Sequence, residues 1–265
     1  MRTRFFTKQF GLALCAVAMV MLSGCATRST GPANPADPLE ASNRAVFEFN
    51  DAVDRAVLKP AAEAYAFVVP QPVRTCINNI FLNLGDVWSW FNSTLQGRQV
   101  DALNTFGRVL LNSTMGLGGC LDIASQTGAK RIPNDFGVTL GVWGLDSGPY
   151  LVLPIMGSST LRDGAGRAVD IYVNQFGYGS LITNIDVRNS IYGLEVVERR
   201  EALLAVTNTI DRTALDRYSF IRDAYLKRRQ AQVDGATAEA QKLPNYEDFG
   251  AEPADEKSLG LSPKK

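Results

Sequence analysis

The sequence predicts a mainly α-helical fold: a single compact helical body that carries one glycine-rich hairpin. Three observations support this fold class. Apolar residues recur at helical spacing over most of residues 37–233, glycine and proline gather instead in the segment 136–157, and no internal repeat divides the chain. With 265 residues, of which 46% are hydrophobic, the chain is long enough to bury a substantial core.

The N-terminal residues have the pattern of an export signal. Basic residues precede an apolar run (10–22) that is too short to span a bilayer, which needs roughly 20 residues. The run ends in Leu22-Ser23-Gly24-Cys25, which resembles the bacterial lipobox, in which the cysteine becomes the acylated first residue of the mature chain. We expect residues 1–24 to be a lipoprotein signal peptide and Cys25 to be the lipid anchor. The alternative is an ordinary signal with an incidental cysteine.

Both ends of the mature chain are expected to lack regular structure. Residues 25–36 are small, polar and proline-containing, and we predict a lipidated, flexible tether. Residues 234–265 are charged and weakly apolar, and we predict a disordered C-terminal tail. The compact domain is therefore expected to occupy residues 37–233.

The first helices follow from capping and periodicity. Asp37-Pro38-Leu39-Glu40 combines an N-cap acid, a proline at the first helical position and a glutamate at N3, which predicts a helix start. Its apolar face continues to Lys59-Pro60, and another helix is expected over 61–69. Apolar stretches between 73 and 111 predict a helix, a turn and a helix, which ends at the glycine cluster 116–119.

The segment 136–157 differs from its neighbours. Glycines and prolines interrupt strongly apolar residues, so a long helix is not expected there. We predict a loop or hairpin with a short strand at 150–153. Beyond it, residues 159–177 are expected to be helical, and 186–233 form the longest periodic stretch, with a break near Asp211.

The cysteines are consistent with an exported protein. Cys15 is removed with the signal peptide and Cys25 is acylated, so Cys76 and Cys120 remain as a pair. In an oxidising periplasm they can form a disulfide that closes a loop of about 45 residues and contributes roughly 3–4 kcal/mol. Two unpaired buried thiols are the alternative.

Composition excludes several functions. The sequence has no histidine, so Ser-His-Asp and Cys-His relays and His-ligated metal sites are impossible. Phosphate-loop, nucleophile-elbow and CxxC motifs are also missing, and we expect no enzyme activity, cofactor or metal. Removal of the signal takes away three basic residues and no acidic one, so 27 basic against 27 acidic residues become 24 against 27. This net charge of −3 argues against a nucleic-acid partner.

Ordered motifs extend from about residue 37 to about 230, behind the lipobox. Together they resemble the MlaA (VacJ) family of outer-membrane lipoproteins. The motifs are Asp37-Pro38-Leu39-Glu40, Asn43-Arg44, Phe49-Asn50-Asp51, Lys59-Pro60, Pro70-Gln71-Pro72-Val73-Arg74, Leu95-Gln96-Gly97, Asn112-Ser113-Thr114, Asp135-Phe136-Gly137, Gly148-Pro149-Tyr150, Leu153-Pro154 and Leu161-Arg162-Asp163.

The resemblance implies a ring of helices around an amphipathic channel, anchored in the periplasmic leaflet of the outer membrane beside a trimeric porin. It implies that mislocalised phospholipid is taken from the outer leaflet and passed to a soluble periplasmic carrier similar to MlaC, which maintains lipid asymmetry. A structural or adaptor lipoprotein without a lipid passage is the alternative. A lipid-modifying enzyme would need an activated nucleophile, and no such constellation is visible.

Under this interpretation the segment 141–154 controls lipid passage. Its glycines supply backbone freedom, its prolines restrict one end, and its apolar side chains contact lipid. A glycine-rich turn packed on a soluble core is the alternative, and Asp146 stands where the family usually has glycine. The candidate gating residues are Gly141, Trp143, Gly144, Gly148, Pro149, Tyr150, Leu151, Leu153 and Pro154.

Charged residues in the same motifs allow two roles. Arg44, Arg74, Arg108, Arg162 and Asp163 could each contact a lipid phosphate. We favour the other role, in which they form buried structural ion pairs with nearby Asp side chains.

Overall fold

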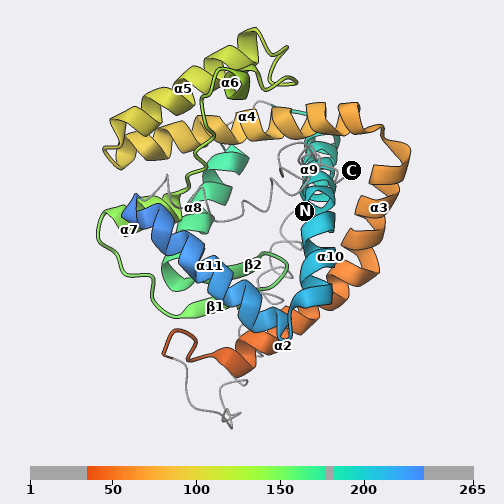
Figure 1. The fold of residues 1–265 in the computed structure, drawn as a ribbon, viewed down its shortest axis with the longest axis vertical. Coiled ribbons are helices and arrows are strands. Elements are labelled where there is room, and N and C mark those ends of the chain that lie inside the picture. The colour runs from red at the N-terminus through yellow and green to blue at the C-terminus, as the bar shows by residue number, and fades with distance from the viewer. Residues whose placement is uncertain (1–34, 177–181, 236–265) are drawn as a thin grey trace, which may run out of the picture.

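The computed structural model describes residues 35–176 and 182–235 (Figure 1). The predicted signal peptide with Cys25, and nearly all of the predicted tether and tail, lie outside these residues. The elements in chain order are α2 (Glu40–Val53), the π-helical turn η2 (Asp54–Leu58), α3 (Lys59–Val68), α4 (Gln71–Leu95), α5 (Gln99–Thr114), α6 (Ile123–Gln126), α7 (Phe136–Val142), β1 (Tyr150–Leu153), β2 (Gly157–Thr160), α8 (Leu161–Phe176), α9 (Ile185–Ala202), α10 (Leu204–Thr213) and α11 (Arg217–Asp234).

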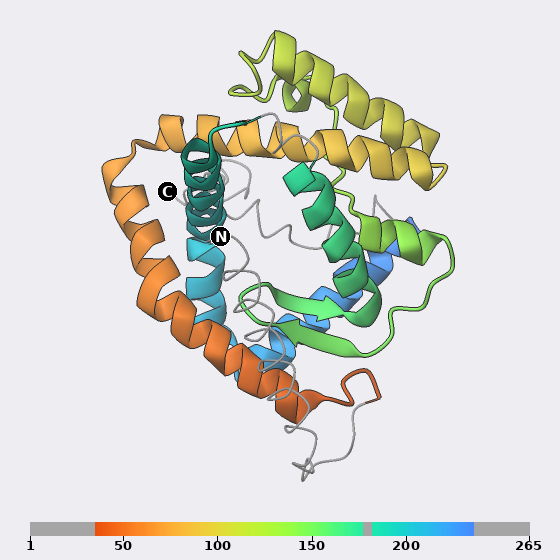
Figure 2. The same cartoon turned by 180° about the vertical axis from the view of Figure 1, so that it is seen from behind.

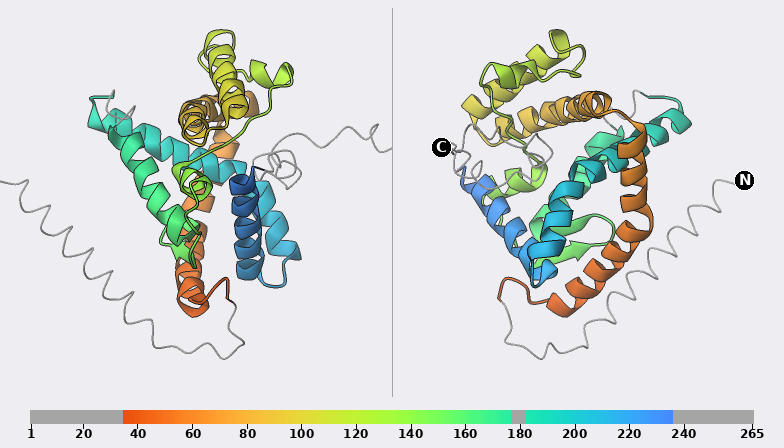
Figure 3. Two further views of the ribbon diagram at one scale, coloured as in Figure 1. Left: turned by 90° about the vertical axis from the view of Figure 1, so that its left-hand side faces the viewer. Right: turned by 45° about the vertical axis from the view of Figure 1, so that its right-hand side comes forward.

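The helices follow one another around a closed frame, which confirms the predicted mainly α, ring-like body with a hairpin (Figures 1 and 2). Helices α2 and α3 form one curved side, α4 crosses the next side, and α7 and α11 lead back towards α2. Helix α9 packs against α3 and α4, and the hairpin contacts α2, α8 and α11. Helices α5 and α6 lie outside the frame, stacked beyond α4 in both views of Figure 3.

The first side of the ring runs without interruption from Glu40 to Val68, so the boundary predicted at Lys59-Pro60 is wrong. Pro60 has no N–H and its ring crowds the carbonyl one turn earlier, which normally breaks a helix. Here the π-helical turn precedes it, and Lys59 N–H bonds to the carbonyl of Asp54. The wider turn lets the chain pass the proline and continue as α3.

The start of α2 also differs from the prediction. The helix begins at Glu40, and no side chain caps it. Asp37 is instead buried and receives hydrogen bonds from Asn43, Tyr218 and Arg222. The carboxylate that local sequence assigns to a cap therefore binds groups from the C-terminal helix α11.

The predicted helix, turn and helix are confirmed as α4 and α5, which are joined by the turn at 96–98. The glycine cluster follows α5 in left-handed conformations at Leu117, Gly118 and Gly119. A side chain at position 119 would lie 2.9 Å from Asn83 Cβ, so glycine is needed for the chain to pass close to α4.

The segment 136–157 contains both the predicted hairpin and an unpredicted short helix. Asp135 accepts a hydrogen bond from Val138 N–H and caps α7. The helix ends in paired bonds from Gly144 N–H to Gly141 and from Leu145 N–H to Leu140, the Schellman arrangement. Strand β1 lies at the predicted residues and pairs antiparallel with β2, Tyr150 opposite Thr160 and Leu153 opposite Gly157.

A small core sits where the hairpin meets the first and last helices of the ring. Tyr150, Val152 and Tyr218 are buried together. Partly buried side chains of α2 and α11 pack around them. At its other end, α11 is held by Arg98 of the α4–α5 turn, whose guanidinium donates to the carbonyls of Gln232 and Val233. Contacts at both ends of α11 therefore close the ring.

Candidate functional site

Helix α5 has an inverted distribution of side chains. Its buried face is mostly polar and charged, whereas its apolar side chains point outwards, with Val100 81% and Leu103 70% exposed. Exposed apolar surface of this kind marks a contact with a partner or a membrane. The buried residues are Ala102, Thr105, Arg108 and Asn112, and the α5 apolar face consists of Val100, Leu103, Phe106 and Leu110.

The interface beneath the α5 apolar face is an ion-pair network centred on Arg108. Its guanidinium contacts Asp86 of α4 at 3.4 Å and Asp122 at 3.0 Å. Arg131 also contacts Asp86, at 2.8 Å. Burial raises the pKa of Asp86 above its usual range, against the opposing effect of both arginines. Two cations thus balance two carboxylates, and Arg108 holds α5 and α6 to α4.

Two asparagines of α2 hold the free edge of β1. Asn43 donates to the carbonyl of Tyr150 and accepts from Val152 N–H, both at 2.9 Å. Asn50 repeats this pattern, donating to Leu153 at 2.9 Å and accepting from Ile155 N–H at 2.7 Å. A carboxamide presents the same donor and acceptor as a peptide group, so the two side chains act as a substitute for a third strand.

The hairpin turn projects apolar side chains away from this clamp. Ile155 is 71% exposed and adopts a left-handed backbone conformation (φ 66°), which is unfavourable for a β-branched residue. Met156 beside it is also exposed. Gly157 supplies the second left-handed residue of the turn (φ 77°). The fixed strands therefore carry an exposed apolar tip.

The loop before β1 connects α7 to the hairpin. Gly144 and Gly148 adopt left-handed conformations there, as expected for glycines that give the backbone freedom. Gly141 has another role: a Cβ at this position would meet Val233 at 2.6 Å and Arg162 at 2.8 Å. The assignment of Gly141 to a flexible hairpin is therefore wrong. It lies within α7, where the absence of a side chain makes room for a buried arginine.

The other candidate gating residues are divided between core and surface. Tyr150 is buried in the core, whereas Trp143 is exposed at the end of α7, where its indole donates to the carbonyl of Leu95 at 3.1 Å. Four residues are partly buried along the loop and strand: Pro149, Leu151, Leu153 and Pro154. These residues therefore lie in one continuous segment, but some are buried in the core and others are exposed to solvent.

A second ion-pair network lies where α7, α8 and α11 meet. Arg229 binds Asp135 through both terminal nitrogens, at 2.6 and 2.9 Å, and contacts Asp163 at 2.8 Å. Burial opposes ionisation of Asp163, but hydrogen bonds from Arg229 and Tyr225 outweigh it and lower its pKa to about 2. Arg162 contacts the other oxygen of Asp163 at 3.0 Å.

The pKa of Asp170 in α8 is shifted in the opposite direction to that of Asp163. Its carboxylate accepts hydrogen bonds from the Trp88 indole at 2.8 Å and from Phe136 N–H at 3.1 Å. Burial and the neighbouring charge of Asp135 raise its pKa to about 6. Asp170 therefore joins α8 to α4 and α7 and changes its charge within a mildly acidic range.

Arg44 and Arg74, two further charged residues from the motifs, also form ion pairs. Arg44 contacts Glu40 at 2.8 Å and Asp216 at 2.6 Å, and Arg74 pairs with Glu201. The predicted buried pairs with Asp are confirmed for Arg108, Arg162 and Asp163. They are not found for Arg44, which is 37% exposed, or for Arg74, whose partner is a glutamate.

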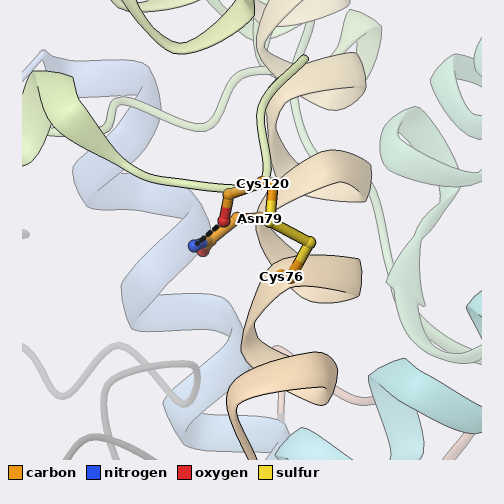
Figure 4. The surroundings of a disulfide bond; sticks show 3 residues. All are labelled: Cys76, Asn79 and Cys120. Carbon is orange, nitrogen blue, oxygen red and sulfur yellow. Dashed lines mark hydrogen bonds between the residues drawn. A yellow bond between two sulfur atoms is a disulfide. The ribbon is translucent and has the colours of Figure 1, made fainter. Parts of the chain in front are cut away.

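Cys76 of α4 and Cys120, which follows the glycine cluster, are joined by a disulfide (Figure 4). Their Cα atoms are 4.2 Å apart. Asn79, one turn after Cys76, donates to the carbonyl of Cys120 at 3.0 Å. The disulfide and this hydrogen bond fix the segment after α5 to the helix that forms the ring.

The most important contacts that the sequence analysis did not predict are those of Asn43 and Asn50 with β1 and the ion pairs of Arg229. Asn43 and Asn50 are seven residues apart on one helix, and this spacing was a usable signal. Arg229 carries no such signal, because its partners Asp135 and Asp163 are 94 and 66 residues away.

Within residues 35–176 and 182–235, no helix is both long and apolar enough to cross a membrane. In the same described residues, no cluster of three or more cysteine or carboxylate side chains is arranged to hold a metal ion.

Comparison with known proteins identifies the family. A family model described as MlaA lipoprotein matches residues 35–232. The intermembrane phospholipid transport system lipoprotein MlaA of Escherichia coli K12 is 33% identical over 240 residues, which is 88% of this chain and 93% of the relative. The Haemophilus influenzae protein of the same name is 34% identical over 244 residues, 86% and 93% of the two chains.

A solved structure has the same fold. It is described as the structural basis for maintenance of bacterial outer membrane lipid asymmetry, and it superposes with a TM-score of 0.63 at 35% sequence identity. The match covers 74% of this chain and 98% of the solved chain. The family model covers most of the sequence, and both relatives match along nearly their full length. The chain therefore belongs to the MlaA lipoprotein family.

Proposed function

We propose that this protein is an outer-membrane lipoprotein of intermembrane phospholipid transport. It takes mislocalised phospholipid from the outer leaflet of the outer membrane and passes it through the ring towards the periplasm, which maintains lipid asymmetry. The proposal rests on the names of the relatives and on one observation above all, the polar interior and apolar exterior of the α4–α5 pair.

The inverted side-chain distribution supports a position in one leaflet. The α5 apolar face is largely exposed, with only its Phe106 ring packed on Trp90 of α4, so its transfer from water to acyl chains is favourable by roughly 25 cal/mol per Å² of apolar area. A charged headgroup cannot cross that hydrocarbon without a large penalty. A polar route enclosed by the ring would lower this penalty while the outer surface remains in lipid.

The proposed gate is the segment 143–154, which follows α7 and leaves out Gly141. Gly144 and Gly148 allow the loop before β1 to move, whereas Asn43 and Asn50 hold the hairpin itself. We therefore place the moving part in the loop 143–149 and the fixed part in β1. Trp143, Leu145 and Ile155 offer exposed apolar contacts to a passing acyl chain.

Attachment through acylated Cys25 would leave the protein in the periplasmic leaflet, beside a trimeric porin and within reach of a soluble phospholipid carrier. An unmodified Cys25 in the mature protein, detected by mass spectrometry, would contradict this attachment. Cys25→Ser should move the chain from the membrane fraction to the soluble periplasmic fraction, whereas Cys76→Ser should leave it in the membrane.

The transport function is tested in cells that lack the protein. A membrane-impermeant amine reagent should label more phosphatidylethanolamine at their surface than in wild-type cells, and expression of the intact chain should reverse the increase. Equal labelling would contradict the proposal and favour the adaptor alternative. Release of free fatty acid or lysophospholipid by the purified chain would favour an enzyme instead.

A further inference from the structure

A hollow of about 320 Å³ opens where the end of β2 and the start of α8 meet α11 and the loop before β1. Three cationic side chains line it: Arg162, Lys227 and Arg229. Ser147 and Thr160 add hydroxyl groups, and no acidic side chain lines it. Arg162 and Arg229 are only 6% and 9% exposed, so their positions are fixed by packing. The lining has the chemistry of an anion site.

Lys227, the lysine at the opening, is the one cation of the lining without an ion pair among the described residues. Behind the lining, Asp135 and Asp163 pair with Arg229, and Asp163 also contacts Arg162. Asp170 lies beside Asp135 in the same network, so the charges behind the lining are nearly balanced, and the cation at the opening that is left to attract an anion is Lys227.

Hydrogen-bond donors are also available. Arg162 has five N–H groups, and its contacts to Asp163 and to the carbonyl of Leu145 use three of them. The Thr160 hydroxyl oxygen accepts from Asp163 N–H, which leaves its proton free to donate. The Lys227 ammonium adds three donors. A phosphate group, which carries mainly acceptor oxygens, matches this set.

We propose that this pocket binds a phosphate group, either in a phospholipid headgroup or as free phosphate. The lipid source deepens the proposed transport function and rests on it. Leu226 in the lining and exposed Leu145 beside it offer apolar surface to the start of an acyl chain.

Phosphate binding at this point would act directly on the proposed gate. Arg162 N–H donates to the carbonyl of Ser147 at 3.1 Å, and its guanidinium reaches the carbonyl of Leu145 at 3.4 Å. A phosphate bound to the remaining N–H groups of Arg162 therefore lies against the loop, beside the contact to Leu145. The pocket would hold a headgroup next to the segment that must move.

The test uses the full-length, acylated chain in phosphatidylcholine vesicles that contain radiolabelled phosphatidylglycerol. A photoreactive p-benzoylphenylalanine replaces Gln230 at the rim. Lys227→Gln should lower the yield of cross-linked lipid about three- to tenfold, as expected for loss of a charged hydrogen bond. Lys130→Gln removes the same charge from an exposed position elsewhere and should leave the yield unchanged.

A second arm distinguishes the two sources of phosphate. The ³¹P line width of inorganic phosphate is measured with the same full-length, acylated chain, without the photoreactive residue, in nanodiscs. Cross-linking that depends on Lys227 assigns the pocket to lipid, and line broadening that depends on Lys227 without cross-linking assigns it to free phosphate. If neither signal depends on Lys227, the proposal is overturned. Phospholipid transfer by the Lys227→Gln variant at the wild-type rate, with no Lys227-dependent signal, would reject the pocket and leave the transport function standing.

Discussion

Asn43 and Asn50, which lie seven positions apart in α2, bind the same edge of β1 with matching pairs of hydrogen bonds. This arrangement ties the hairpin to the first helix of the ring. The loop before β1 is held differently, at the start of α8, where Leu161 N–H donates to the carbonyl of Pro149 and Arg162 N–H to that of Ser147.

Asn43→Leu should loosen the hairpin. The substitution keeps the side-chain volume but leaves the buried Val152 N–H without a partner, which costs about 1–3 kcal/mol. Hydrogen exchange of peptides that cover 150–155 should accelerate. Asn104→Leu is the matched control, since it removes one exposed bond to Lys130, and it should not change exchange in the hairpin. Unchanged exchange in Asn43→Leu would show that the clamp does not hold β1.

Two glycine substitutions in helices should have opposite effects. Gly141→Ala places a methyl group against Arg162 and Val233, and overpacking of this kind costs about 1–3 kcal/mol. Gly107→Ala in α5 meets nothing within 4 Å and should stabilise the protein by about 0.5–1 kcal/mol. Thermal unfolding followed by circular dichroism checks both. A Gly141→Ala variant as stable as wild type would show that the packing of Arg162 and Val233 against α7 tolerates a side chain at this position.

The disulfide should contribute strongly to stability. Joining residues 44 positions apart restricts the unfolded chain by about 4 kcal/mol in the loop-entropy account. The Cys76→Ser/Cys120→Ser double variant should unfold at a lower denaturant concentration. Thiol labelling of the unreduced, denatured wild-type protein should find neither cysteine free, and labelling of both would contradict the bond.

Asp170 and Asp163 should give opposite pH dependence. The pKa of Asp170 is about 6 in the folded protein and 3.8 in the reference state, so its ionised form opposes folding above pH 6. Asp170→Asn should therefore gain stability over wild type at pH 7, and the gain should shrink as the pH falls from 6 to 4. The asparagine oxygen can still accept from Trp88.

Asp163 provides the control for that experiment. Its pKa is about 2, so its charge stabilises the fold above pH 3.8, and this stabilisation is lost as the pH falls towards 2. Asp163→Asn should destabilise the protein at pH 7 and converge with wild type in acid. Parallel pH profiles for the two variants, measured by denaturant unfolding, would contradict the assigned electrostatics.

The helices of the ring could be predicted from the sequence because apolar spacing is a local property. The π-helical turn before Pro60 and the short helix α7 could not, since a local bulge and a capping aspartate outweighed the effects of proline and glycine. Local sequence places Asp37 at a helix cap, because its partners Tyr218 and Arg222 lie 181 and 185 residues away and leave no local signal. Contacts of that range cannot be read from periodicity.

The candidate site, like the fold, could be predicted only in part from the sequence. The segment 141–154 stood out because of its composition, but composition did not distinguish its individual glycines. Gly144 and Gly148 have the left-handed conformations that glycine permits, while Gly141 is required by the packing of Arg162 against α7. That packing depends on α8 and α11, which meet α7 only in the folded chain.

The most direct test of the account is phospholipid transfer from labelled vesicles to a soluble lipid-binding acceptor, with a tether across the proposed gate. A Cβ built at position 148 lies 3.1 Å from Leu161 Cβ, so a small outward shift of the loop brings the pair to the roughly 3.5–4.5 Å that a disulfide requires. The Gly148→Cys/Leu161→Cys variant should stop transfer when oxidised and regain it when reduced. Each single variant controls for backbone strain caused by the new cysteine. Wild type in the same reductant controls for reduction of the Cys76–Cys120 bond. The untethered chain should transfer chemically intact phospholipid. Undiminished transfer with the tether fully formed would contradict gating, and no transfer by wild type would contradict the function itself.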